Sequence, residues 1–504
     1  MKSYRTWITA LALTVLLSFA LAAPAAATSE IVVAQGVDAT TMIPNMESVT
    51  STNNVLEHIY DTMVWRDENL VIEPALAVSW ETPDDLTWIF HLREGVYWHD
   101  GTPFTAADVK YTLDYILDTD NASQYRPYHV LIEDVEVIDD HTVRITTEAP
   151  HPLMLARLSM TQIFAKHHME AHDRTYLASN PLGTGPFKFV EWVRDERIVL
   201  ERNEDHWRGP AEIERIVFRP IPESSTRIAE LSTGNVDVIV NVPPHQMETV
   251  NNISGAGIAT VPSVRVIFLG INTENEGPWQ DKLVRQALNY ALNREIIIEA
   301  ILDGLGTPLA PGGLSNYHFG YDPTVEPFPY DPDRAQELMA EAGYPDGFEI
   351  SIVIPDGRYA MDREVGEAIV GMLRNIGLTV NYEILEWGVY VGRINAREMS
   401  DLYLLGWGGA TVDAEGTFGP LLRSGNPLSY FNNEEVDQLI RAGATTVDPD
   451  ARMAIYSELH QLLKEEAPWV YLHQQEDIYG LSDRLNWEPR ADERLWMYYA
   501  SVND

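Results

Sequence analysis

Cysteine is absent from all 504 residues of the chain. Its absence excludes thiol catalysis, disulfide bonds and metal centres that use cysteine ligands. It also excludes the lipid-modified cysteine that tethers many exported proteins to a membrane. If the chain is exported, we expect it to diffuse freely and not to be a lipoprotein.

Positive charge is scarce as well. The chain has 35 Lys and Arg, of which only six are Lys, against 76 Asp and Glu, so its formal net charge is −41. The acids are dispersed along the chain, and the resulting field repels nucleic acid and anionic lipid. We therefore expect neither as a partner. The acidity fits a saline medium as well as it fits an ordinary acidic exported protein.

Long apolar runs are missing after the N-terminus. Lys2 and Arg5 precede an apolar stretch at residues 7–23, and three small alanines follow, ending at Ala27. This pattern predicts a signal peptide over residues 1–27, cleaved near Ala27. No later segment approaches about 18 uninterrupted apolar residues. We expect a mature periplasmic protein that does not insert into the membrane.

The remaining chain is too long for one hydrophobic core, because single cores stop growing near about 250–300 residues. Two or more lobes are therefore expected. A helix is predicted over 54–64, and another starts at Thr105, where Asp108 completes a capping box. After Pro262, strand and helix patterns alternate, including one long helix over 281–302. This order favours an α/β lobe with a mostly parallel sheet.

Several ordered stretches of sequence carry a family resemblance. They are residues 90–109 (FHLREGVYWHDGTPFTAADV), 180–189 (NPLGTGPFKF), 200–203 (LERN), 284–291 (VRQALNYA), 330–335 (YDPDRA) and 341–347 (EAGYPDG). Together they resemble the family 5 extracytoplasmic solute-binding proteins, the dipeptide, oligopeptide and nickel receptors of ABC importers. The similarity covers nearly the whole mature chain.

The resemblance implies a periplasmic-binding-protein-like α/β fold with two lobes, three interleaved domains and mixed sheets joined by a hinge. We expect domain I at residues 28–65, 175–262 and 477–504, domain II at 66–174, and domain III at 263–476. The implied function is capture of a small peptide or peptide-like solute by hinge closure. The partners would be that ligand and the permease subunits of the importer, with the receptor a monomer that needs no cofactor.

Other functions remain open beside peptide capture. An oligosaccharide or glycoside fits the 13 Trp and 23 Tyr, and a metal chelate or opine-like compound is a third ligand class. A periplasmic hydrolase is the alternative from a different class. The sequence lacks the G-x-S-x-G, H-E-x-x-H and phosphate-loop motifs of common hydrolases, so we expect no enzyme.

One glycine-rich loop follows the buried strand expected at 402–405. Trp407 offers a flat contact surface there, and Gly408 lets the backbone approach a ligand closely. In the peptide-binding relatives the matching loop carries an aspartate that pairs with the ligand's amine. That position is Ala410 here, and Asp413 matches a later acid that is either a ligand contact or structural. The loop therefore argues against an ionic amine anchor at position 410.

A second group of candidates lies near the carboxyl ends of two other strands, where α/β sheets place ligand contacts. Arg358 and Tyr359 follow one strand, and the guanidinium of Arg358 suits a carboxylate or phosphate. A surface ion pair is the alternative role for Arg358. Trp387 and Tyr390 follow the next strand, and we expect one of them to face the cleft.

The other lobe offers fewer candidates. Asn45 and Met46, in the loop after the first strand, are the expected ligand contacts from that side. His168 and His172 have a spacing that can chelate a transition metal, but the polar sequence around them is typical of a solvated helix. We therefore predict no metal site.

Overall fold

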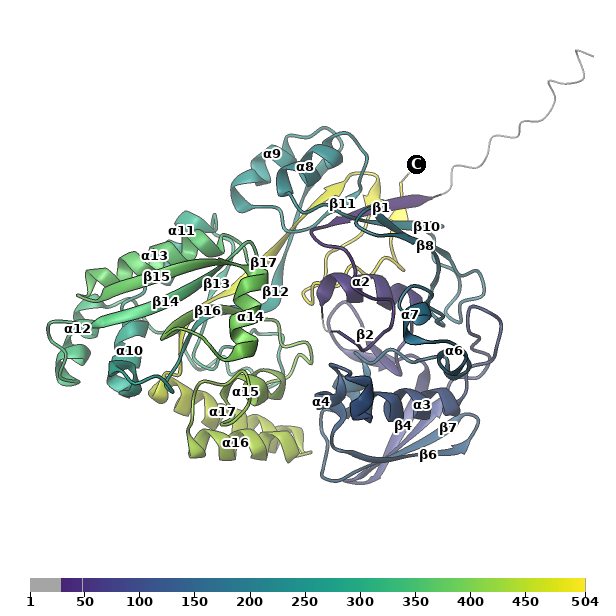
Figure 1. Cartoon of the computed structure of the whole chain (residues 1–504), viewed down its shortest axis with the longest axis horizontal. Helices are drawn as coiled ribbons and strands as arrows, with labels where there is room; N and C mark the ends of the chain where they lie inside the picture. The colour runs from purple at the N-terminus through teal and green to yellow at the C-terminus, as the bar shows by residue number, and fades with distance from the viewer. Residues whose placement is uncertain (1–28, 48, 504) are drawn as a thin grey trace, which may run out of the picture.

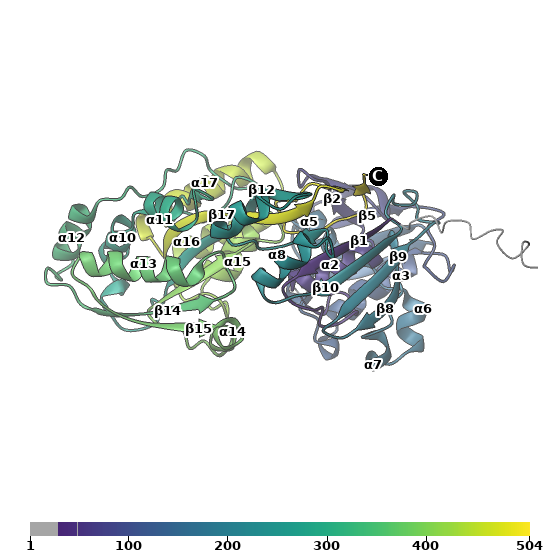
Figure 2. The ribbon, with the colours of Figure 1, turned by 90° about the horizontal axis from the view of Figure 1, so that it is seen from above.

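The computed structural model describes residues 29–47 and 49–503, so the predicted signal peptide at 1–27 and its cleavage near Ala27 lie outside the described residues. Two lobes make up the described chain (Figure 1). They lie end to end along the long axis (Figure 2). Two long strands, β12 (Ala256–Ile271) and β17 (Trp469–Ser482), run side by side through both lobes.

Lobe 1 contains the N-terminal strands and one part of the large sheet. Strand β1 is parallel to β10 and β11, whereas β9 is antiparallel to both β10 and β8. Alternating apolar residues such as Ile31 and Val33 face its core. The strands are β1 (Glu30–Gln35), β8 (Phe187–Val193), β9 (Arg197–Arg202), β10 (Arg215–Pro220) and β11 (Val238–Ile239).

Helix α2 covers this sheet, four to five residues earlier than predicted. It spans Thr50–Ile59 and not 54–64, because Tyr60 has an extended backbone and Thr62 already forms a β-bridge with Gln162. Helices α8 (Ser224–Ser232) and α9 (Met247–Asn251) lie near the hinge end, with a 3₁₀ turn at Pro244–Gln246.

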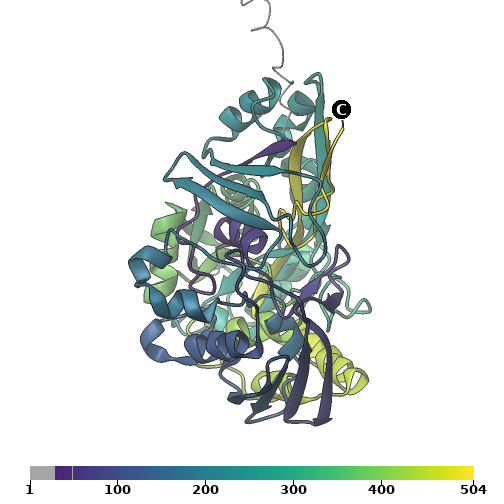
Figure 3. The ribbon, with the colours of Figure 1, turned by 90° about the vertical axis from the view of Figure 1, so that its right-hand side faces the viewer.

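A separate antiparallel sheet lies at the opposite end of lobe 1 from α8 and α9 (Figure 3). Its order is β4 (Ala77–Asp84), β5 (Thr87–Leu92), β7 (Thr142–Thr147) and β6 (Ile132–Asp139). Helix α3 (Ala106–Leu117) packs on it, and the predicted capping box of Thr105 and Asp108 is confirmed. Shorter elements are β2 (Val64–Arg66), β3 (Ile72–Pro74), a 3₁₀ turn at Thr119–Asn121, α4 (Arg126–His129), α5 (Met154–Leu158), α6 (Lys166–Ala171) and α7 (Arg174–Leu177).

Lobe 2 has a mixed sheet, so the expectation of a mostly parallel one is wrong. Strand β14 is parallel to β15 and β16. Strand β12 is antiparallel to both β16 and β17, because the chain enters lobe 2 along β12 and leaves it along β17. The elements are β13 (Thr307–Pro308), β14 (Glu349–Asp356), β15 (Thr379–Glu386), β16 (Leu402–Trp407), α12 (Pro332–Glu341), α13 (Asp362–Asn375), α14 (Trp387–Ala396), α15 (Glu415–Leu422), α16 (Glu434–Thr445) and α17 (Pro449–Glu466).

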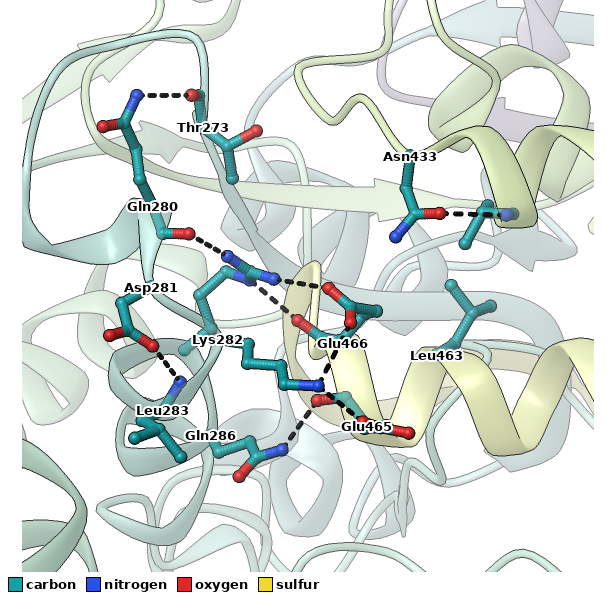
Figure 4. Close-up of polar contacts among 12 residues, drawn as sticks. Thr273, Gln280, Asp281, Lys282, Leu283, Gln286, Asn433, Leu463, Glu465 and Glu466 are labelled. Atoms are coloured by element: carbon teal, nitrogen blue, oxygen red, sulfur yellow. Dashed lines mark hydrogen bonds and ion pairs between the residues drawn. The ribbon is translucent and has the colours of Figure 1, made fainter. Parts of the chain in front are cut away.

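The single helix predicted over 281–302 is also wrong. Helix α10 (Lys282–Tyr290) ends, and Asn293 then caps a new helix, α11 (Arg294–Ile301), by accepting from the N–H of Ile296. A 3₁₀ turn (Pro278–Gln280) precedes α10. Figure 4 shows how Lys282 and neighbouring side chains of α10 hold the carboxyl end of α17. These contacts lie on the outer part of lobe 2, away from the hinge.

The hinge is the place where the two lobes share one sheet. The strand order of this shared sheet is β15-β14-β16-β12-β17-β11-β1-β10-β9-β8, with β13 beside β17. The β12–β17 register shifts between Pro262 and Val266, which marks the point where the strands leave lobe 1 for lobe 2. The chain ends with a short pair, β18 (Leu485–Asn486) and β19 (Ser501–Val502), beside lobe 1.

Candidate functional site

Polar contacts join the facing surfaces of the two lobes. Nη2 of Arg66 in lobe 1 donates to the carbonyl oxygen of Thr411 in lobe 2 at 2.5 Å. Nη2 of Arg157 pairs with Oε2 of Glu415 at 3.2 Å, again between the lobes.

The Arg358 loop is fixed at the carboxyl end of β14. The carboxylate of Asp362 accepts hydrogen bonds from the backbone N–H groups of Gly357, Arg358 and Tyr359 at 2.9 to 3.1 Å. Burial raises the pKa of Asp362, while these donors oppose the rise. The loop is therefore held by a short-range cap, which sets the direction of the Arg358 side chain.

Aromatic rings surround the guanidinium of Arg358. Its Cζ lies 5.2 Å from the ring centre of Tyr359 and 5.6 Å from that of Trp387. Burial, and then the nearby charge of Arg265, lower the pKa of Arg358. Among the described residues its guanidinium has no hydrogen bond or ion pair, so the surface ion pair considered above is not formed. Its charge is available to an anion.

A second arginine lies close by but is neutralised. The guanidinium of Arg265 binds both carboxylate oxygens of Glu493 at 2.6 and 2.9 Å. Asp477 lies beside this pair, and burial, followed by the charge of Glu493, raises its pKa to about 7. Neither Arg265 nor Glu493 was predicted, because they are 228 positions apart and belong to no motif.

The glycine-rich loop packs against the same aromatic group. Nε1 of Trp407 donates to the carbonyl oxygen of Gly416 at 2.9 Å, which fixes the half-buried ring. Gly408 lies beside Arg265, since a Cβ on Gly408 would be 3.5 Å from Nη2 of that arginine. Ala410 is exposed at the end of the loop. The loop thus presents a ring, open backbone and no acid.

Four other predicted contacts lie inside the protein. Asn45 exchanges two hydrogen bonds with the backbone of Gln162, and Met46 packs in a small buried cluster. The hydroxyl of the fully buried Tyr390 donates to the carbonyl oxygen of Leu404. Asp413 forms a bidentate ion pair with Arg452, with both distances 2.7 Å. These partners occupy their polar groups, so we leave all four out of the proposed site.

Lobe 1 contains a pocket that sequence reasoning missed. The space between its lining side chains is about 500 Å³, a volume that includes open solvent. Its walls come from α2, β2, the segments before α6 and before β10, and the C-terminal segment, and they include Glu57, Arg66, Gln162, Arg208, Arg490, Arg494 and Trp496. These residues are scattered over more than 400 positions, so no local pattern signals the pocket.

The histidine pair does not form a metal centre in the described chain. The rings of His168 and His172 are 4.9 Å apart, but a ring nitrogen of His168 contacts the carbonyl oxygen of Asn180 at 2.8 Å. Across residues 29–47 and 49–503, three or more His, Asp or Glu side chains do not gather in a metal-binding group. No helix of the described residues is long and apolar enough to span a membrane.

Two lobes, a shared two-stranded hinge and charged groups between the lobes define a solute receptor that closes on its ligand. Residues 71–428 match the bacterial extracellular solute-binding proteins, family 5 middle region. The chain belongs to this family, and it is the solute-binding component of an ABC importer.

Individual proteins support the assignment. The chain is 31% identical to heme-binding protein A of Haemophilus influenzae, over 86% of this chain and 85% of the relative. It is 28% identical to glutathione-binding protein GsiB of Salmonella typhi, over 92% of both chains. The solved periplasmic binding protein DppA of Helicobacter pylori, in complex with peptide STSA, is similar with a TM-score of 0.83 and 27% identity, over 94% of this chain and 98% of that one.

Proposed function

We propose that this receptor captures a peptide-like solute that carries a carboxylate, and that Arg358 binds this carboxylate. The guanidinium of Arg358, partly buried and without an acidic partner, is the observation that carries the proposal. Within the described residues its donors bind no protein group, and a bidentate carboxylate would match their planar geometry. Trp387 and Trp407 would pack on the rest of the ligand.

The relatives favour a carboxylate as well. The similar proteins are named for heme and glutathione, and the solved neighbour holds a peptide. These molecules differ in size and shape, but each bears carboxylate groups. A neutral oligosaccharide would leave Arg358 without a counter-charge, so we place it behind a peptide-like ligand. An opine-like compound carries a carboxylate and stays the second candidate.

Capture would proceed by closure of lobe 2 on lobe 1, with bending at the register shift between Pro262 and Val266. The closed receptor would then dock as a monomer on the permease subunits in the periplasm, after cleavage of the leader near Ala27. We propose binding without catalysis. The division into domains I, II and III at the boundaries given above is kept as part of this proposal, and the separate sheet β4–β7 supports domain II.

The proposal is tested by isothermal titration calorimetry with glutathione and trialanine. Arg358→Met keeps the length and apolar contacts of the side chain and removes its charge. We expect it to weaken binding by about 2 kcal/mol, or about 30-fold. Arg423→Met, in an exposed part of lobe 2, is the control and should leave affinity unchanged. Equal affinity of the wild type and Arg358→Met would contradict the proposed role.

A further inference from the structure

The lobe 1 pocket holds polar atoms that have no partner in the described chain. Two are acceptors, Oε1 of Glu57 and Oε1 of Gln162, on residues that are 7% and 4% exposed. Two are donors, Nε of Arg66 and Nε1 of Trp496. Buried polar atoms are nearly always hydrogen-bonded in folded proteins, so four in one pocket indicate a missing partner.

The charges around the pocket are already mostly paired. Arg494 lies 3.3 Å from Oε2 of Glu57, and Arg490 binds Asp492 at 2.7 Å. Arg66 differs from both, because its two terminal nitrogens donate to the carbonyl oxygens of Leu70 and Thr411 and contact no carboxylate. Among the described residues, the pocket therefore offers two arginines without an ion pair, Arg66 and Arg208, and one carboxylate oxygen without a donor.

We propose that this pocket binds the α-ammonium carboxylate head group of the ligand. The ammonium group would donate to Glu57 and Gln162, and the carboxylate would accept from Arg66 and Trp496. A zwitterion matches two unpaired acceptors and two unpaired donors, whereas a simple anion or cation matches only half of them. This inference rests on the proposed function and names the chemical class of the ligand's second end.

The position of the pocket explains the missing acid of the glycine-rich loop. Arg66 donates to the carbonyl oxygen of Thr411, the residue that follows Ala410. The pocket wall is thus in contact with the loop in which the resemblance places an amine-binding aspartate. In this chain the carboxylate for the amine would come from Glu57 of lobe 1 and not from lobe 2. The other end of the ligand would remain with Arg358.

Calorimetry on the full mature chain tests the inference with glutathione, γ-glutamylalanine and their N-acetylated forms, because both γ-glutamyl peptides carry an α-ammonium carboxylate group at one end and a carboxylate at the other. The variants are Glu57→Gln and Gln162→Leu, with Glu248→Gln as control, because Glu248 is exposed and far from the pocket. We expect N-acetylation to weaken wild-type binding by about tenfold or more, and Glu57→Gln to weaken binding of the free-amine probes equally. The N-acetylated probes should bind the wild type and Glu57→Gln alike.

The outcomes separate the two proposals. If the wild type binds free and N-acetylated probes equally, or if Glu57→Gln and Gln162→Leu both bind like Glu248→Gln, the head-group site is wrong while the proposed function stands. If the folded wild type binds none of the four probes, the proposed function fails, and this inference fails with it. Should Glu57→Gln not fold, as seen by circular dichroism, Gln162→Leu and the acetylated probes still decide.

Discussion

Arg265 and Glu493 form a bidentate ion pair between the hinge and the C-terminal segment, with Nε–Oε1 at 2.6 Å and Nη2–Oε2 at 2.9 Å. Arg265 lies on β12 within the register shift, and Glu493 follows β18 near the end of the chain. Their side chains are only 10% and 17% exposed. The pair therefore fixes the C-terminal segment to β12, one of the two strands shared by the lobes.

Removing one partner of this pair should destabilise the protein. Glu493→Gln removes the carboxylate that binds the buried guanidinium of Arg265, which costs about 3 kcal/mol of unfolding free energy. Urea unfolding followed by fluorescence measures the loss. Glu196→Gln is the matched control, because Glu196 pairs with Arg197 at the surface, and such pairs contribute about 0–1 kcal/mol. An equal decrease of unfolding free energy in both variants would show that the pair of Arg265 and Glu493 stabilises the protein no more than a surface ion pair does.

Asp413 should matter for stability and not for ligand binding. Its two ion-pair distances to Arg452 are 2.7 Å, and the two side chains are 9% and 6% exposed. We expect Asp413→Asn to lower the unfolding free energy by about 3 kcal/mol and to leave ligand affinity unchanged in the folded protein. Asp114→Asn, which breaks an exposed pair with Lys110, serves as control. If Asp413→Asn lowers ligand affinity but not the unfolding free energy, Asp413 is a ligand contact and this prediction is wrong.

The contact between Arg157 and Glu415 should favour the closed arrangement of the lobes. Arg157 also donates to the carbonyl oxygen of Tyr128 at 2.6 Å, so it stays oriented when Glu415 is removed. Glu415→Gln removes this ion pair and with it about 1.5 kcal/mol of stabilisation of the closed form. The ratio of open to closed molecules would then rise about tenfold. Small-angle scattering should show a larger radius of gyration for the ligand-free variant. Glu398→Gln, at an exposed position in lobe 2, is the control and should give the same scattering curve as the wild type. Identical curves for the wild type and both variants would show that the contact between Arg157 and Glu415 does not favour the closed form.

Glu57 gives the stability a defined pH dependence. Burial raises its pKa from 4.5 to about 7, and Arg494 only partly opposes this. The folded protein thus holds the proton more tightly than the unfolded chain, so the stabilisation is complete below about pH 4.5 and is lost as pH rises through about 7. Between pH 5 and pH 8, the unfolding free energy of Glu57→Gln should rise by about 2–3 kcal/mol relative to that of the wild type. Urea unfolding at several pH values measures this, and parallel curves for the two proteins would contradict it.

Local signals in the sequence predicted much of the fold. The capping box at Thr105 and Asp108 depends on neighbours three residues apart, so it could be identified without tertiary information. The break between α10 and α11 was missed because apolar residues continue with helical spacing on both sides of Asn293, which prefers to cap a helix. Sheet direction was missed because it depends on β17, which arrives from 200 residues further on.

The predicted site residues also show what local sequence signals contain and what they leave out. Arg358 and Trp387 each follow a strand, and their proximity follows from the parallel pairing of β14 and β15. Only one of Trp387 and Tyr390 was expected to face the cleft, and the sequence could not tell which: α14 turns Tyr390 into the core, because a helix directs neighbouring side chains to different faces. The partners Glu57 and Trp496 come from opposite ends of the chain, so only the folded structure brings them into one pocket.

The most direct test of the account is mass spectrometry of the small molecule released by denaturing protein purified from its native host. A receptor that encloses its ligand retains it through purification when affinity is high. We expect a peptide-like compound with a carboxylate at one end and an α-ammonium carboxylate group at the other. A neutral sugar, or any ligand without a carboxylate, would contradict it.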